Sequence, residues 1–105
     1  KSARFRAKCV WCLVLLIQRF GSKIFRSGDV VQRLVQFLAH MLTDASSEVR
    51  NLARLAAAAL SSAASSPEDF DRLLRRSLSN QDAAKVRQCL DAAPRADPEP
   101  EVTGP

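Results

Sequence analysis

The stretch LTDASSEVRNLARLA, residues 42–56, decides the fold of this chain. A short polar turn around Asp44 separates two segments in which apolar residues recur every three or four positions, the period of an amphipathic α-helix. Ser46 or Ser47 is the expected cap of the second helix, and Glu48 in its first turn offsets the positive end of the helix dipole. The stretch therefore predicts two antiparallel helices joined by a tight turn.

The same period continues on both sides of this turn and predicts five helices, at about residues 2–20, 29–42, 47–60, 67–78 and 80–93. Asp29, Ser66 and Asn80 are the expected N-caps of the second, fourth and fifth helices. Gly21 is expected to end the first helix, and residues 22–28 to form a connection. The 105 residues are 47% apolar but only 6% aromatic, with 3 Gly, which favours an all-α fold over a sandwich or barrel.

Helical spacing also predicts which side of each helix is buried. In the first helix the expected buried face consists of Phe5, Cys9, Cys12, Leu13, Leu16, Ile17 and Phe20. Trp11 lies in the same apolar run and is expected in the core. In the second helix the expected buried face consists of Val30, Val31, Leu34, Phe37, Leu38, Met41 and Leu42. In the fifth helix it consists of Ala83, Val86, Cys89 or Leu90, and Ala93.

The helices also form an internal repeat. Phe5 aligns with Val49, 44 residues later, and this alignment places Cys9, Cys12 and Leu16 on Ala53, Ala56 and Leu60. Val30 aligns with Phe70, 40 residues later. Repeats of ~40 to 47 residues are typical of the helical solenoids built from HEAT or armadillo units. The sequence therefore predicts a solenoid fragment, whose helix pairs must stack on further repeats to bury their apolar surface.

Residues 42–56 resemble the HEAT-repeat signature, in which an Asp ends the first helix and Val-Arg opens the second, here Asp44 and Val49-Arg50. An Arg one turn into the second helix can reach the Asp, so Asp44 and Arg50 are expected to hold the turn together. Residues 2–92 further resemble the C-terminal part of a TOG domain of the crescerin family, the TOG array regulators of axonemal microtubules. The motifs that carry this resemblance are Arg19-Phe20-Gly21, residues 69–74 (DFDRLL), residues 80–82 (NQD) and Lys85-Val86.

The TOG resemblance implies a non-catalytic module that binds tubulin along the edge formed by its inter-helix turns. It places the protein in the cytoplasm, at the cytoskeleton or a cilium, and implies further HEAT repeats of the parent protein upstream of residue 1. Tubulin is acidic, so basic residues at the edge suit it. Carried onto this chain, the edge consists of Lys1, Ser2, Arg4, Thr43, Ser46, Ser47 and Asn80. A general HEAT or armadillo scaffold with no affinity for tubulin stays open as the alternative.

Charge narrows the choice of partner. The net charge is +5, and residues 1–41 hold 8 basic residues and 1 acidic residue. Such a basic end can attract nucleic acid, anionic lipid or an acidic protein surface, and the alternative is an ordinary solvated helix face. The sequence lacks clusters of Lys and Arg interleaved with exposed aromatics, which counts against nucleic acid. The longest apolar run, residues 9–17, is shorter than the ~20 residues of a membrane span. Residues 93–105 are rich in Pro and acidic residues and are expected to form a disordered tail after the repeat domain, residues 1–92.

No set of catalytic residues emerges from the sequence. His40 is the only His and is expected to face solvent, and there is no Gly-rich phosphate loop or nucleophile elbow. Cys9 and Cys12 form a C-x-x-C pair, but the chain has no second pair of ligands for zinc. The three Cys are expected to be reduced thiols. The sequence therefore predicts a protein that is not an enzyme, with no cofactor, metal or small-molecule substrate.

Overall fold

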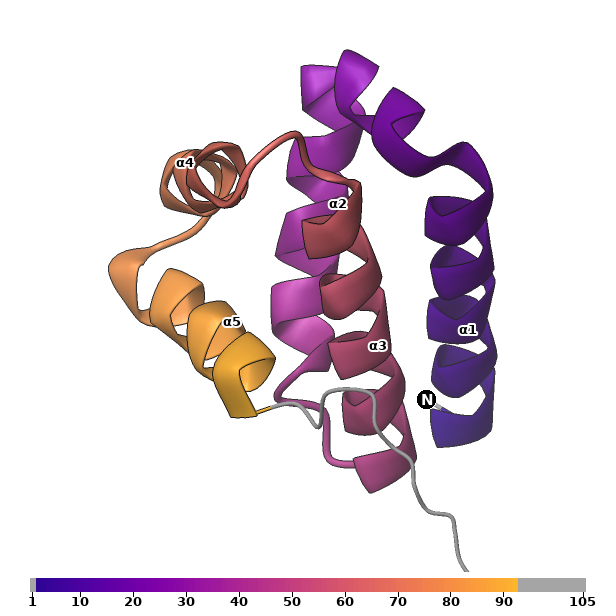
Figure 1. Ribbon diagram of the computed structural model, residues 1–105. Coiled ribbons are helices and arrows are strands. Elements are labelled where there is room, and N and C mark those ends of the chain that lie inside the picture. The colour runs from indigo at the N-terminus through magenta and orange to yellow at the C-terminus, as the bar shows by residue number, and fades with distance from the viewer. Residues whose placement is uncertain (1, 93–105) are drawn as a thin grey trace, which may run out of the picture.

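The computed structural model describes residues 2–92, and this part of the chain folds into five α-helices and a short 3-10 helix, with no strand (Figure 1). The elements in chain order are α1 (Ala3–Phe20), η1 (Gly21–Arg26), α2 (Gly28–Met41), α3 (Ser47–Ala63), α4 (Pro67–Ser77) and α5 (Asn80–Ala92). The predicted all-α fold is confirmed. Lys1 and the predicted tail, residues 93–105, lie outside the described residues.

Three of the helix starts follow the prediction. The hydroxyls of Ser2, Ser46 and Ser66 accept a hydrogen bond from the backbone N–H three residues further on, which caps α1, α3 and α4. Pro67 occupies the first turn of α4, where its missing N–H costs nothing. Gly21 ends α1 with a positive φ of 57°, a backbone conformation in which a side chain is strained.

Two of the predicted caps are wrong by one or two residues. Ser27, not Asp29, caps α2, because its hydroxyl accepts from the N–H of Val30. Ser79, not Asn80, precedes α5 and accepts from the third N–H of that helix. In both places a serine stands one or two positions before the predicted cap, and the serine caps the helix. The expected connection after Gly21 is also helical, because η1 fills most of it.

The helices pack around α3 (Figure 1). α1 lies along α3 and makes the most extensive contact in the molecule, while α2 and α5 also pack on α3. α2 in turn contacts α4 and α5. In Figure 1 α1, α2 and α3 run up the picture, whereas α4 is seen nearly end-on. All five helices contribute to one core, whose largest fully buried side chains are Ile17, Leu60, Leu74, Val10, Val31 and Val49.

The face that α1 buries is not the predicted one. Its buried residues are Ala7, Val10, Val14 and Ile17, of which only the last was expected. Four of the expected core residues are exposed: Phe5, Cys12, Leu16 and Phe20. Trp11 was also expected in the core and is 46% exposed. Short side chains such as Ala7 and Val10 let α1 approach the Ala-rich α3 closely, and this contact decides the orientation of a helix that is apolar on every side between residues 9 and 17.

The buried faces predicted for α2 and α5 agree better with the structure than the face predicted for α1. In α2, Val30 is 53% exposed against expectation, and the buried Val35 and Ala39 were not predicted. In α5, Ala83 and Val86 are buried as predicted. Cys89 and Leu90 are half-buried, and Ala93 lies outside the described residues.

Candidate functional site

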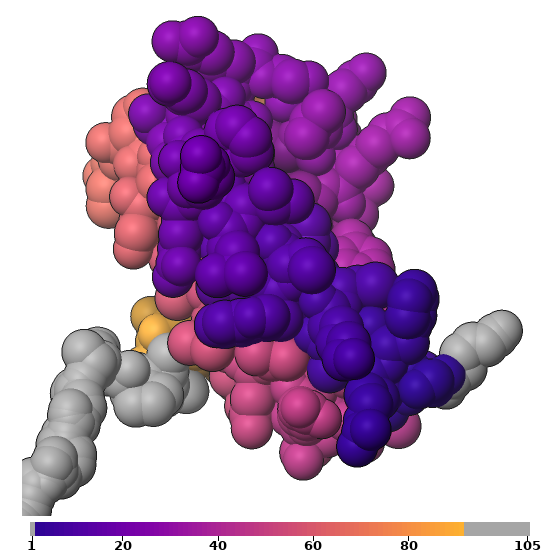
Figure 2. Space-filling model, turned by 90° about the vertical axis from the view of Figure 1, so that its right-hand side faces the viewer, coloured from indigo at the N-terminus to yellow at the C-terminus, as the bar shows by residue number. Residues whose placement is uncertain are grey.

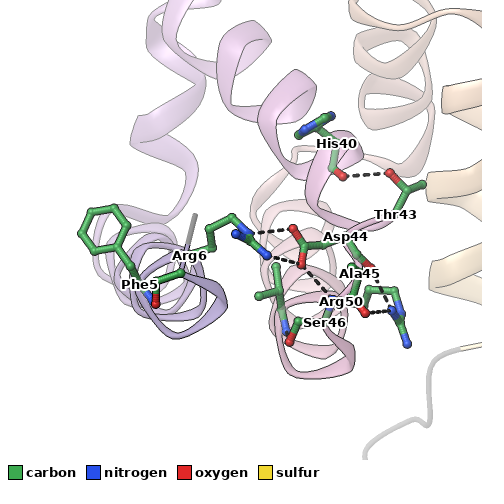
Figure 3. A network of polar contacts seen from close by, with 10 residues as sticks. Phe5, Arg6, His40, Thr43, Asp44, Ala45, Ser46 and Arg50 are labelled. Carbon is green, nitrogen blue, oxygen red and sulfur yellow. Dashed lines mark hydrogen bonds and ion pairs between the residues drawn. The ribbon is translucent and has the colours of Figure 1, made fainter.

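A polar network joins the start of α1 to the turn between α2 and α3 (Figure 3). Arg6 Nε donates to Asp44 Oδ1 over 2.8 Å, and Arg6 Nη2 donates to Asp44 Oδ2 over 3.0 Å. Oδ2 also accepts from the backbone N–H of Ser46 at 2.9 Å. The Asp44 side chain is only 9% exposed, so this is a partly buried, two-pronged ion pair.

Arg50 completes the turn in a different way from the one expected. Its Nη1 donates to the carbonyl oxygens of Asp44, at 2.8 Å, and Ala45, at 3.0 Å. Asp44 and Arg50 therefore both make hydrogen bonds within the turn. However, the Asp44 carboxylate receives its ion pair from Arg6 on α1. The backbone carbonyls that Arg50 binds are turn groups that the two helices leave without helical partners.

The Arg6 and Asp44 side chains of this network are both ionised at neutral pH. The hydrogen bonds from Arg6, followed by the bond from the Ser46 N–H, lower the pKa of the Asp44 carboxyl below its ordinary value of 3.8. The bond to Asp44 correspondingly raises the pKa of the Arg6 guanidinium. The two groups therefore stay ionised together, and their ion pair ties α1 to the turn.

The predicted partner-binding residues divide into two groups. Near the network, Arg4, Thr43 and Ser47 are exposed. The hydroxyls of Ser2 and Ser46 are already used as helix caps, and Lys1 lies outside the described residues.

Asn80 belongs to a different part of the surface. The end of α4 just before it is held by Gln36 Nε2, which donates to the Ser77 carbonyl over 3.1 Å from the middle of α2. Figure 1 correspondingly shows the α4–α5 turn away from the α2–α3 turn at the bottom of the picture. The structure thus brings together the start of α1 and the α2–α3 turn. It leaves the α4–α5 turn, which carries Asn80, apart from them.

Two residues of this region were missed by sequence reasoning. Arg6 is the ion-pair partner of Asp44, 38 residues away in the chain. The sequence pattern did not point to it, because the predicted buried face of α1 lay on other residues. Trp11 was assigned to the core, but it lines an open hollow between α1 and α3 together with Arg4, Lys8 and Glu48. It adds an exposed aromatic ring beside the edge.

The described residues do not show a metal-binding arrangement. Within residues 2–92 no group of three or more His, Cys, Asp or Glu side chains is placed to hold a metal ion. The three thiols are free, and burial raises the pKa of Cys89 on α5. In the same part of the chain, no helix combines the length and apolar character needed to cross a membrane.

A second ion network holds α4 to α5. The carboxylate of Asp71 accepts hydrogen bonds from Arg87 on α5 and from Arg75 on α4. The bond from Arg87 is the main cause of a lowered pKa at Asp71. Asp71 therefore supports packing between these helices rather than chemistry.

Comparison with protein-family models, with curated proteins and with solved structures gives no match for this chain. The described residues define an all-α protein with a rigid polar edge at the start of α1 and the α2–α3 turn. The resemblance to HEAT repeats and TOG domains is one of sequence pattern alone.

Proposed function

We propose that this chain is a non-catalytic protein-interaction module of the helical-repeat type, and that its partner is tubulin. The observation that carries the proposal is the Arg6–Asp44 ion pair, which ties the start of α1 to the α2–α3 turn. The tie makes one continuous polar edge from two segments far apart in the sequence. Arg4 at this edge is exposed and forms no ion pair with another described residue, so it is free to meet an acidic partner.

The packing of the helices supports a repeat architecture. Helices two apart in the chain contact one another, as α1 does α3, α2 does α4, and α3 does α5. In helical-repeat proteins each repeat packs in this way on its neighbours, and the turns line up along an edge. The resemblance of residues 2–92 to TOG domains names tubulin as the partner of that edge. Under this proposal the protein acts on microtubules in the cytoplasm, including those of cilia.

A general scaffold for a partner other than tubulin is the second candidate. It is favoured by the exposed Trp11, which lies beside the edge in the hollow between α1 and α3. Exposed aromatic and Arg side chains are common energetic centres of protein interfaces in general. The scaffold needs the same fold and differs only in the partner that the edge selects.

Binding of purified tubulin to the full 105-residue chain tests the proposal. The edge variant carries Arg4→Glu and Ser47→Glu. The matched control carries Arg76→Glu and Ser62→Glu, the same change of charge at exposed positions of α4 and α3. We expect the edge variant to bind at least ~10-fold more weakly than the control. Equal binding by the two variants contradicts the edge assignment, and no binding by the unmodified chain contradicts tubulin as its partner.

A further inference from the structure

An open apolar groove runs between α1 and α2, on the side of α1 that α3 does not cover. Its walls include Leu13, Leu16 and Phe20 from α1 and Val30, Leu34 and Phe37 from α2. The lining is almost entirely apolar, although Leu16 is 45% exposed and Val30 is 53% exposed. Figure 2 looks onto α1 from this bare side, with α2 in magenta to its right. Large exposed apolar side chains that lie side by side in a hollow make it a candidate interaction site.

The internal repeat shows what the α1 wall of the groove corresponds to. Residues 44 positions after Leu13 and Leu16 are Ala57 and Leu60 on α3. There they are covered, and Leu60 is only 1% exposed. The side chains that meet them come from α2 and are Val35 and Leu38. A helix therefore covers these positions on α3, whereas no described helix covers the equivalent positions on α1.

The α2 wall has the same relationship to α4. Residues 40 positions after Val30 and Leu34 are Phe70 and Leu74, and both are buried. They meet the same two α2 side chains that cover α3. α2 thus lies in a slot between α3 and α4, and one repeat earlier the equivalent slot lies between α1 and α2. The groove has the shape and register of a seat for one amphipathic helix.

The charge of the groove walls selects the occupant. Residues 3–41, which form α1, η1 and α2, carry seven Lys and Arg and a single carboxylate, Asp29. Of these basic residues, Arg6 is paired with Asp44, and Arg4 and Lys8 line the hollow between α1 and α3 rather than the groove. Arg33 lines the groove and Arg19 is exposed on α1, and neither forms an ion pair with another described residue. A second copy of this chain would place one basic face against another, and residues 93–105 have no apolar period to fill the groove. Acidic residues on the flanks of the helix satisfy these charges.

We propose that the groove between α1 and α2 docks an amphipathic helix of a partner protein. That helix has an apolar i, i+3, i+4 stripe and acidic flanks, and it lies antiparallel to α1, as α2 does to α3. This site goes beyond the tubulin edge, since its walls lie on other residues and its occupant does not depend on tubulin. It is a helix-in-groove mode of recognition.

The sequence of α2 supplies a designed probe. The acidic peptide covers residues 27–42 with Val30→Glu, Gln32→Glu, Arg33→Glu and Phe37→Glu, which keeps the side chains that α2 presents to α3 and α4. The basic peptide has Lys at the same four positions. A third peptide adds Val35→Asp and Leu38→Asp to the acidic one and so breaks the stripe. Each peptide carries a fluorophore, and its binding to the full chain is followed by fluorescence anisotropy.

Alkylation of the thiols locates the bound peptide. Cys12 is exposed and lines the groove, whereas Cys89 lies on α5 and serves as the internal reference. We expect micromolar binding of the acidic peptide and slower alkylation of Cys12 but not of Cys89. The basic peptide should bind at least ~10-fold more weakly, since opposite charges meet only in the acidic pair. The peptide with the broken stripe should not bind.

Variants of the chain separate the groove from the rest of the surface. Leu16→Asp should abolish binding of the acidic peptide. Leu15→Asp should leave it unchanged, because Leu15 is equally exposed on α1 but does not line the groove. Arg4→Glu, the edge substitution used with tubulin, should also leave peptide binding unchanged. Loss of tubulin binding and loss of peptide binding can therefore be told apart.

Three results would overturn the proposal. The first is equal binding of the acidic and basic peptides. The second is protection of Cys12 without peptide, either by self-association of the chain or by anionic phosphatidylserine vesicles. The third is protection only when the acidic helix is fused to the chain and never in trans, which would assign the groove to a segment of the same polypeptide.

Discussion

Arg6 on α1 and Asp44 in the α2–α3 turn form a two-pronged ion pair, with Nε–Oδ1 and Nη2–Oδ2 distances of 2.8 and 3.0 Å. The same carboxylate accepts from the Ser46 N–H and so also fixes the start of α3. One side chain therefore holds together three segments of the structure. The orientation of the proposed edge depends on this contact more than on any other polar contact near it.

Replacing Asp44 with Asn should lower the melting temperature, because it removes the negative charge that Arg6 and the Ser46 N–H both contact. The control is Asp69→Asn, which removes a carboxylate whose pair with Arg72 is well exposed. Exposed pairs contribute little to stability, so the melting temperature of the control should scarcely change. Thermal unfolding followed by far-UV circular dichroism measures both. A loss at Asp44 no larger than at Asp69 would show that the Arg6 pair is not structural.

The pH dependence of stability should show the same carboxylate. Asp44 and Asp71 have folded-state pKa values lowered from 3.8, by hydrogen bonds from Arg6 and Arg87 respectively. A lowered pKa means that the unfolded chain takes up protons first as the pH falls. Their contribution is therefore complete well above pH ~4 and is lost as the pH falls through the folded-state pKa values.

Chemical denaturation at neutral pH and at several acidic pH values checks this dependence. The double variant Asp44→Asn, Asp71→Asn should lose less of its remaining stability on acidification than the unmodified chain. Parallel curves for the two proteins would contradict the assignment. This stability is lost only on acidification, because neither carboxylate changes its charge above neutral pH.

Local signals in the sequence predicted local structure well. Ser46, Ser66 and Pro67 start their helices where capping chemistry requires them. The errors lie where the outcome depends on residues far away in the chain. Residues 9–17 of α1 are apolar on every side, so periodicity could not choose between two faces, and packing on α3 made the choice.

The candidate site likewise combines contacts between residues that are close in the sequence with contacts between residues that are far apart in it. Asp44 and Arg50 are close in sequence, and the expectation that they meet at the turn came from their spacing. Arg6 is 38 residues from Asp44, and only the packing of α1 on α3 brings it into reach. The groove could not be predicted either, because the residues that line it on α1 were expected to be buried.

Enlarging Ala56 should destabilise the protein, because α3 is packed on several sides by other helices. Ala56 is fully buried within the Ala-rich part of α3. Ala56→Leu adds volume without space to receive it, and such overpacking costs about 1–3 kcal/mol. Leu55→Ala on the same helix alters an exposed side chain and should change the free energy of unfolding by less than about 0.5 kcal/mol. Urea unfolding of both variants measures the difference, and an unchanged midpoint for Ala56→Leu would mean that α3 is not tightly enclosed.

Removing the hydroxyl of Ser77 should stabilise the protein. This side chain is buried at the end of α4, and its Oγ forms no hydrogen bond with another described residue. Gln36 binds the backbone carbonyl of Ser77, so Ser77→Ala keeps that contact. An unsatisfied buried polar group costs about 1–3 kcal/mol, so the variant should gain about 1 kcal/mol or more in unfolding free energy.

The control for Ser77→Ala is Ser62→Ala, at an exposed position in the last turn of α3. It includes the small gain that Ala brings to any helix, ~0.5 kcal/mol at most, without the relief of a buried hydroxyl. Urea unfolding of the two variants and the unmodified chain gives the two differences directly. An equal gain in both variants would assign the effect to helix propensity. A loss of stability in Ser77→Ala alone would mean that the hydroxyl contributes a stabilising contact, because only such a contact outweighs the cost of burying it.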